Sequence, residues 1–366
     1  MTLLLALSAL AFDGRTASTD DSDVDVRAPE RTFADPIING VDATADDYPQ
    51  AGAMMMDAYL DLGSFGAGNF RSIVCSSTLI APDVVMLAAH CLDEDAFTYG
   101  MGSMEINEVR WSRQADLSQL DGTHAAAPWP NDSIVAIDWE TNRNFSLNEM
   151  GLGVSENYDI ALLFLETPVL DTPFAYIPTV EETDQIEEGT PVTVVGWGQQ
   201  VATDAWESPE EGDYAIKQMG DSVVGLVGEF EFQVGPDEDD VRKCHGDSGG
   251  PTFIHIDTDT EETMRVIGVT SHSFDNSDCN ETGGVDTRVM AYREWIENQM
   301  VERCEDGTRV WCDVYGLPEA PLPEPEVVEE EGEEEEPAGC GCSSTADGAL
   351  WLGLGAAALL VARRRG

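Results

Sequence analysis

The hexapeptide at residues 246–251, Gly-Asp-Ser-Gly-Gly-Pro, constrains the fold of this chain more than any other segment. The hydroxyl of Ser248 is a weak nucleophile at neutral pH, so it can react only beside a base and beside donors that stabilise an oxyanion. Gly246 lets the backbone turn its N–H groups inward, because glycine tolerates unusual dihedrals. Alone, such a segment is usually a surface turn, so a catalytic role requires the fold to bring a base to it.

Two other segments each hold one polar residue that could complete such a site. His90 lies in residues 87–91, Leu-Ala-Ala-His-Cys, after an apolar stretch, and Asp159 lies at the mouth of the apolar run 158–163. Each has an ordinary interpretation, as a satisfied structural histidine and as a turn aspartate. Histidine, aspartate and serine in this order, each in this local sequence, would rarely coincide by chance. Together they favour nucleophilic catalysis.

These three segments resemble those of the chymotrypsin–trypsin family of serine endopeptidases, and the resemblance extends over residues 37–303. It implies an all-β fold of two packed six-stranded antiparallel barrels with a C-terminal helix. The short apolar runs separated by turn residues agree with antiparallel barrels. The resemblance also implies a serine-type endopeptidase, a hydrolase that acts on protein or peptide substrates and needs no cofactor. We expect a monomer.

The matching residues have defined roles in that family, whose mechanism is established. His90 would act as general base, Asp159 would orient the imidazole and stabilise its charged form, and Ser248 would form the acyl-enzyme. The backbone N–H groups of Gly246 and Ser248 would form the oxyanion hole. Ser271 would lie beside Asp159 and offer its backbone to the substrate.

The resemblance also locates the primary specificity pocket. Counting back six residues from Ser248 gives Arg242 at its base, where trypsin-like members keep an aspartate that binds Arg or Lys. The other pocket residues are two small wall residues and two histidines near the entrance: Ser273, Gly284, His245 and His272.

The arginine at the pocket base allows two interpretations. Arg242 could bind a substrate carboxylate bidentately, with Lys243 adding positive potential, which predicts cleavage after Asp or Glu. Alternatively, Arg242 pairs internally with an acid such as Asp286, and the pocket takes small or apolar side chains. Both interpretations stand at this point.

Residues 37–40, Ile-Ile-Asn-Gly, resemble the mature amino terminus of the family. There, proteolysis frees an isoleucine ammonium that pairs with the buried aspartate before the nucleophile, here Ile37 and Asp247. The chain departs from the usual pattern because Pro36 precedes Ile37 and the nearest basic residue is Arg31. A trypsin-like activator would not cut there, and a chain that is never activated would be a catalytically silent surface binding module.

Eight cysteines indicate an oxidising compartment. The resemblance pairs Cys75 with Cys91 and Cys244 with Cys279, and proximity alone pairs Cys304 with Cys312. The spacing of Cys75 and Cys91 could suggest a metal, but no second histidine–cysteine cluster accompanies it, so we expect no metal site.

The chain carries 71 acidic and 18 basic residues, a net charge of −53. Such a charge excludes nucleic acid as a partner. It could steer basic substrates, although solubility, for example in a saline environment, explains it more simply.

Composition divides the chain into six expected segments. They are a signal peptide at 1–11, a propeptide at 12–36, the protease domain at 37–303, a small disulfide loop at 304–317, a disordered acidic Pro/Glu linker at 318–339 and a sorting segment at 340–366. Helical spacing of apolar residues predicts an amphipathic helix at the end of the protease domain: Val289, Tyr292, Ile296 and Met300.

The last segment holds Cys340 and Cys342, a short apolar helix over residues 349–362 and an arginine cluster at 363–365. Fourteen helical residues span about 21 Å, which is too short for a full bilayer core. The order of cysteines, apolar helix and basic end resembles a MYXO-CTERM-type sorting tail. That resemblance implies a processing protease, attachment to the membrane through the tail, and a secreted protein displayed at the cell surface. A structural protein on a stalk would explain the tail but not the three catalytic segments.

Overall fold

The computed structural model describes residues 36–120, 126–183, 185–200, 214–256, 264–275, 279 and 282–320. The chain separates into two compact units, Met1–Pro321 and Leu322–Gly366. The second unit lies wholly outside the described residues, as do the expected signal peptide and nearly all of the propeptide. The predicted linker after residue 320, the apolar helix and the sorting cysteines Cys340 and Cys342 therefore stay predictions.

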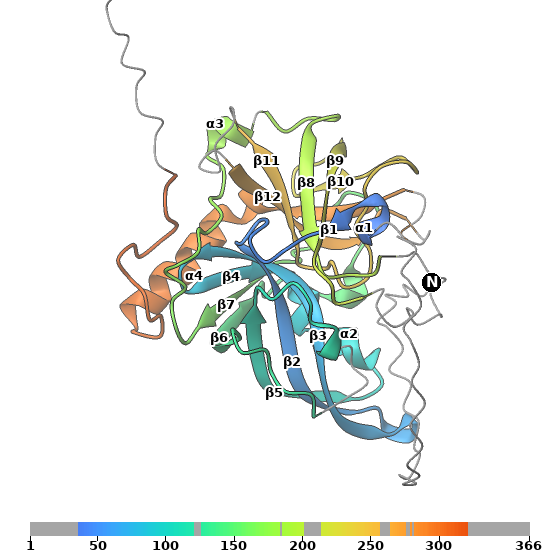
Figure 1. The fold of residues 1–366 in the computed structure, drawn as a ribbon, viewed down its shortest axis with the longest axis vertical. Coiled ribbons are helices and arrows are strands. Elements are labelled where there is room, and N and C mark those ends of the chain that lie inside the picture. Colours follow the sequence, from blue (N-terminus) through green and yellow to red (C-terminus); the bar gives the residue numbers. More distant parts are fainter. Residues whose placement is uncertain are drawn as a thin grey trace, which may run out of the picture. The chain divides into compact units, whose positions relative to one another are not determined.

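The first half of the described chain forms a closed antiparallel barrel in the order β2-β3-β4-β7-β6-β5 (Figure 1). Its strands are β2 (Ala51–Asp61), β3 (Ala67–Ala81), β4 (Val84–Leu87), β5 (Ser103–Ser112), β6 (Ile134–Thr141) and β7 (Ala161–Leu165). Strand β2 pairs with both β3 and β5, so most of its residues are buried. Gly52 is required there because a Cβ would lie 2.2 Å from the indole nitrogen of Trp111.

The second half forms a six-stranded barrel in which β9-β10-β13-β12-β11-β8 is closed by pairing of β8 with β9. The strands are β8 (Pro191–Gly196), β9 (Gln218–Val227), β10 (Glu231–Val234), β11 (Pro251–His255), β12 (Met264–Ser273) and β13 (Gly284–Arg288), and β1 (Val41–Asp42) adds to the edge of β9. The predicted all-β fold of two six-stranded barrels with a C-terminal helix is confirmed.

The helices are short except the last. They are α1 (Pro36–Asn39), α2 (Glu94–Thr98), α3 (Val180–Thr183) and α4 (Arg293–Glu305), with 3-10 turns η1 (Gly63–Phe65), η2 (Ala89–Leu92), η3 (Ser118–Leu120), η4 (Leu147–Glu149) and η6 (Val289–Tyr292). The four apolar residues predicted at helical spacing lie on η6 and α4 and are buried in the main core. Within the described part of the chain, no helix combines the length and apolar character needed to cross a membrane.

Three disulfides join Cys75 to Cys91, Cys244 to Cys279 and Cys304 to Cys312. These are the three pairs expected from the sequence. The loop after α4, which the third disulfide closes, is held on the first barrel by a buried ion pair of Arg309 with Asp83, at 2.8 Å.

The main hydrophobic core runs through both barrels and includes residues of β2 to β7, β11 and β12. Ser76 in β3 links the barrels by hydrogen bonds. Its N–H donates to the Ser248 carbonyl at 2.9 Å, and its hydroxyl donates to the Gly246 carbonyl at 3.0 Å. The junction between the barrels thus fixes the turn that carries the predicted nucleophile.

Candidate active site

His90 and Asp159 form a direct contact between two elements of the first barrel. His90 lies on η2 and Asp159 lies just before β7. The His90 Nδ1 is 2.7 Å from one carboxylate oxygen of Asp159, and the His90 backbone N–H donates to the other at 2.9 Å. A carboxylate only accepts, so Nδ1 carries the proton and Nε2 is left as the acceptor.

Burial and charge act against each other in this pair. Burial alone would lower the pKa of His90, but the nearby Asp159 carboxylate outweighs it, and the net pKa is above the ordinary histidine value. Burial would raise the pKa of Asp159, yet the His90 charge and hydrogen bonds from His90 and Ser271 hold it below the ordinary value. The arrangement therefore favours an ionised Asp159 beside an imidazole that is ready to accept a second proton.

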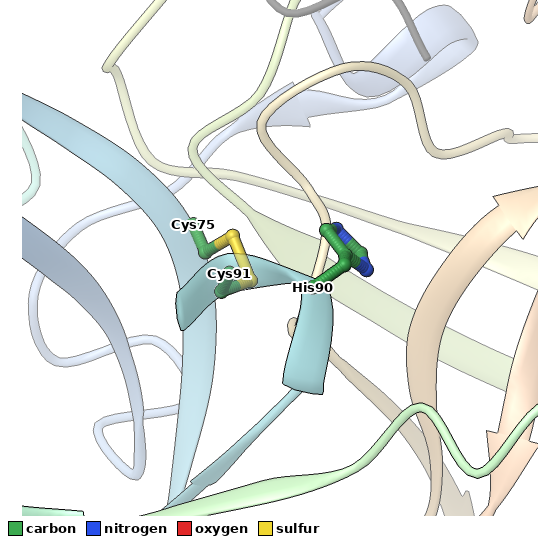
Figure 2. A group of neighbouring side chains, drawn as sticks. All are labelled: Cys75, His90 and Cys91. Carbon is green, nitrogen blue, oxygen red and sulfur yellow. A yellow bond between two sulfur atoms is a disulfide. The ribbon is translucent and has the colours of Figure 1, made fainter. Parts of the chain in front are cut away.

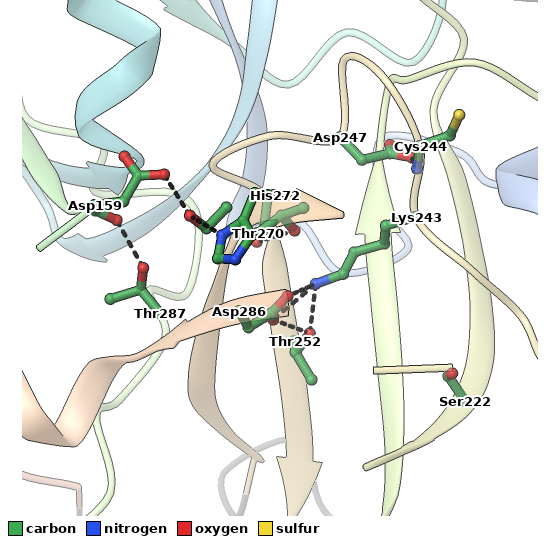
Figure 3. A network of polar contacts seen from close by, with 12 residues as sticks. Asp159, Ser222, Lys243, Cys244, Asp247, Thr252, Thr270, His272, Asp286 and Thr287 are labelled. Carbon is green, nitrogen blue, oxygen red and sulfur yellow. Dashed lines mark hydrogen bonds and ion pairs between the residues drawn. The ribbon is translucent and has the colours of Figure 1, made fainter. Parts of the chain in front are cut away.

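The second barrel also holds Asp159. The Ser271 hydroxyl on β12 donates to the Asp159 carboxylate at 2.5 Å, and the Thr287 hydroxyl on β13 donates to the Asp159 carbonyl at 2.8 Å (Figure 3). Ser271 therefore lies beside Asp159, the position expected for it from the sequence. Asp159 is fixed from both barrels, which restricts the orientation of the His90 ring.

The turn around Ser248 lies between β10 and β11 and depends on glycines with positive φ. Gly246 has φ 93°, and a Cβ there would lie 2.5 Å from the Tyr214 ring. Ser248 is partly exposed. Its backbone bonds to Ser76, whose neighbour Cys75 is joined by a disulfide to Cys91, next to His90 (Figure 2). One hydrogen bond and one disulfide thus bring the turn and the histidine to the same part of the fold.

Asp247 is completely buried beneath this turn. Its carboxylate accepts from the Gly198 N–H at 2.8 Å and from the Cys244 N–H at 2.9 Å. Burial raises the pKa of Asp247 to about 6 despite these donors. Ile37 is buried in the core of the second barrel. It is an internal residue in this chain, so its nitrogen is an amide and carries no ammonium charge.

Lys243, next to Arg242 at the base of the expected specificity pocket, forms a buried ion pair. Asp286 pairs with Lys243, whose Nζ lies 2.5 Å and 2.7 Å from the two carboxylate oxygens of Asp286 (Figure 3). Lys243 also adds little positive potential for a substrate, since its charge is offset by Asp286.

Arg242 itself is 3% exposed, and its backbone N–H donates to the Ile38 carbonyl at 3.0 Å. Burial lowers the pKa of Arg242. The negative charges of Glu238, Asp240 and Asp239 act in the opposite direction and raise it, but burial outweighs them. The two expected wall residues, Ser273 and Gly284, are direct partners across β12 and β13. The expected entrance histidines differ in exposure, since His272 is buried and His245 is partly exposed.

Two groups of cysteine and histidine lie close enough to share a metal, Cys75–His90–Cys91 and Cys244–His245–Cys279. In both groups the cysteines are joined as disulfides, as Figure 2 shows for the first. A disulfide sulfur is not a thiolate, and thiolates are the cysteine ligands that zinc requires. Neither group therefore offers a zinc ligand set.

Two residues and one contact that support this site could not be recognised in the sequence. Ser76 and Thr287 are a serine and a threonine in strands without a distinctive motif, and the contact of His272 with Ser271 depends on the local strand geometry. Their roles follow only from pairing between distant segments.

Comparisons with known proteins agree on one family. A family model described as Trypsin matches residues 62–296. Chymotrypsin-like elastase family member 1 of Canis lupus familiaris is 29% identical over 274 residues, which cover 72% of this chain and 91% of the relative. A trypsin of Saccharopolyspora erythraea is 26% identical over 275 residues, covering 72% and 98%. Serine protease Hayan of Drosophila melanogaster is 27% identical over 279 residues, and the match spans 71% of this chain but 38% of that relative.

Proposed function

This chain belongs to the trypsin family, and from that membership we propose that it is a serine endopeptidase that cleaves peptide bonds in protein substrates. The observation that carries the proposal is the buried 2.7 Å contact of His90 Nδ1 with Asp159. It leaves Nε2 free to act as a base, in a fold where Ser248 lies at the junction of the barrels. A buried carboxylate–imidazole pair of this kind suits general-base catalysis near neutral pH.

In the proposed reaction, His90 Nε2 takes the hydroxyl proton of Ser248 while the serine oxygen bonds to the scissile carbonyl carbon. Asp159 stabilises the imidazolium that forms. The N–H groups of Gly246 and Ser248 donate to the oxyanion. His90 then gives its proton to the leaving amine, and water hydrolyses the acyl-enzyme through the same base.

The test is hydrolysis of a protein substrate by Ser248→Ala, with Ser64→Ala as the matched control because Ser64 is an exposed serine of η1. Loss of a nucleophile removes several orders of magnitude in rate while the protein stays folded. The control should keep its activity. Near-native turnover by Ser248→Ala would overturn the mechanism. No turnover by any processed form would support the alternative, a silent binding module.

For specificity, we propose cleavage after Asp or Glu. The support is the charge of Arg242 at the position that the family uses for the pocket base, which a substrate carboxylate could bind bidentately. Glu238, Asp239 and Asp240 compete for the same charge. If these acids hold Arg242, the pocket takes small or apolar side chains.

A peptide library distinguishes these two specificities. Efficient cleavage after Asp or Glu, weakened in Arg242→Ala and kept in Arg113→Ala, would support the acidic specificity. A preference for apolar residues would support internal pairing of Arg242. Efficient cleavage after Arg or Lys would contradict the pocket assignment.

We further propose that cleavage before Ile37 activates the protein and that the segment 340–366 sorts it to the cell surface after secretion. Activation is proposed because a freed Ile37 ammonium would neutralise Asp247, whose buried carboxylate has only backbone N–H partners among the described contacts. Sorting is proposed from the order of Cys340, Cys342, the apolar run and the arginine cluster.

A further inference from the structure

Asp159 is linked to a second imidazole through Ser271, whose hydroxyl donates to the same Oδ2 that contacts the His90 ring. Strand β12 shifts its register with β13 between Thr270 and His272. Successive side chains on a regular strand point to opposite faces, but a bulge re-aims them. The Ser271 hydroxyl therefore reaches Asp159 at 2.5 Å while the Nδ1 of His272 lies 3.0 Å from that same hydroxyl oxygen (Figure 3).

The loop before Asp159 fixes the tautomer of His272. The Nε2 of His272 lies 3.1 Å from the carbonyl of Gly153. A carbonyl only accepts, so Nε2 must carry the proton. Gly153 is held in place because its own N–H donates to the Phe274 carbonyl at 2.7 Å, just beyond the end of β12.

The charged groups around His272 come from four elements. Burial and the charge of His90 on η2 oppose protonation of His272. The carboxylates of Asp159 before β7 and Asp286 on β13 favour its protonation, although Lys243 neutralises Asp286. Burial prevails and lowers the pKa of His272. At neutral pH the ring is thus neutral, with its proton on Nε2, so Nδ1 acts as an acceptor.

Ser271 therefore has one hydroxyl proton and two acceptors, the Asp159 carboxylate and the His272 Nδ1. The more strongly the His272 Nδ1 attracts this proton, the weaker is the hydrogen bond that Ser271 donates to Asp159. A carboxylate with a weaker donor is more basic, and a more basic Asp159 stabilises the charged form of His90 more strongly.

We propose that His272 is a positioning residue: its Nδ1 draws the Ser271 hydroxyl proton and so keeps Asp159 strongly basic toward His90. The inference rests on the proposed function, because it concerns the base of that reaction. It assigns His272 a role distinct from lining the substrate pocket, since it acts through Ser271 on the free enzyme.

The test uses the processed protein. The quantity measured is the pKa of His90, from the acid limb of the pH profile of kcat/KM and from NMR titration of the His90 ring. In His272→Phe the Ser271 proton belongs to Asp159 alone, so the pKa of His90 should fall by about one unit. Ser271→Ala removes the donor from Asp159 and should shift the pKa upward. His272→Phe in the Ser271→Ala background should cause no further shift. His255→Phe is the matched control, because His255 is an exposed histidine at the end of β11, and it should cause no shift.

Three results would overturn the proposal. The first is an unchanged His90 pKa in folded His272→Phe, and the second is a His272→Phe shift of equal size in the wild-type and Ser271→Ala backgrounds. The third is a lower His90 pKa in Ser271→Ala. If His272→Phe does not fold, nitrogen NMR of the wild-type ring decides. A neutral His272 with its proton on Nε2 at about pH 7 supports the proposal, and a doubly protonated ring contradicts it. Both NMR readouts need no turnover, so their failure is separate from failure of the proposed protease activity.

Discussion

Lys243 and Asp286 form an ion pair almost completely shielded from solvent, with side chains 1% and 0% exposed and Nζ–O distances of 2.5 Å and 2.7 Å. The Thr252 hydroxyl, 2.8 Å from Nζ, completes the cluster by donating to Asp286. Such a pair adds little net stability compared with apolar residues, but each charge is costly without the other. The residue that follows Arg242 in the sequence is thus committed to the interior of the second barrel.

We therefore expect Asp286→Ala to lower the free energy of unfolding by roughly 3–5 kcal/mol, because it leaves Lys243 buried and unpaired. The double variant Lys243→Met with Asp286→Leu should lose much less. Denaturant unfolding measures both. The control is Asp171→Ala, since Asp171 is 81% exposed and 3.8 Å from Arg113, and an exposed pair contributes below about 1 kcal/mol. Equal losses for Asp286→Ala and Asp171→Ala would contradict the assignment.

The fold and the contact of His90 with Asp159 could be predicted because the three candidate catalytic residues each lie in a distinctive local sequence. The pairing of Lys243 with Asp286 could not, because the two residues are 43 positions apart and meet only when β13 pairs with β10 and β12 in the second barrel. The contact of His272 with Ser271 was missed for a related reason. It depends on a strand bulge, which leaves no mark in the alternation of residue types.

Asp247 links the proposed activation to a pH dependence of stability. Its pKa in the full-length chain is raised by burial to about 6, above the ordinary aspartate value of 3.8. A folded-state pKa above the unfolded value gives stability that is present below the unfolded pKa and is lost as pH rises through the folded pKa. Raising the pH from about 4 to 6 should thus cost the full-length protein up to roughly 3 kcal/mol from this group.

Cleavage that frees the Ile37 ammonium should lower the pKa of Asp247 and remove this loss. Thermal unfolding over that pH range, with full-length protein and protein shown by N-terminal sequencing to begin at Ile37, measures the difference. Asp247→Asn in the full-length chain is the control and should also lack the loss. The same pH dependence in the full-length and processed proteins would refute the pairing of Ile37 with Asp247.

Gly246 should be needed for activity because of its backbone conformation. At φ 93° and with Tyr214 2.5 Å from an added Cβ, Gly246→Ala must shift the turn that is proposed to present the oxyanion donors. Loss of one such donor costs about 100- to 1,000-fold in kcat. The control is Gly307→Ala, at φ 81° with nothing within 4 Å of the added Cβ. It should cost about 1 kcal/mol in stability and leave kcat unchanged. Equal kcat in the two variants would argue against the proposed oxyanion turn.

The C-terminal segment gives a prediction about location. Because an acidic, proline-containing stretch precedes Cys340, the apolar run and the arginine cluster, deletion of residues 340–366 should release active protein into the medium. Activity assays of membrane and medium fractions from producing cells measure the partition. Identical partition of the full-length and truncated proteins would show that the segment does not sort the protein.

Activation of Ser248 as a nucleophile by His90 and Asp159 can be measured by covalent labelling with a fluorophosphonate, followed by peptide mapping of the processed protein. A serine with a working base should form one adduct, on Ser248. His90→Ala and Asp159→Asn, shown to be folded, should label far more slowly, because the first lacks the base and the second no longer fixes its tautomer. No adduct on folded, processed wild-type protein, or equal labelling of Ser248→Ala, would show that Ser248 is not the activated nucleophile.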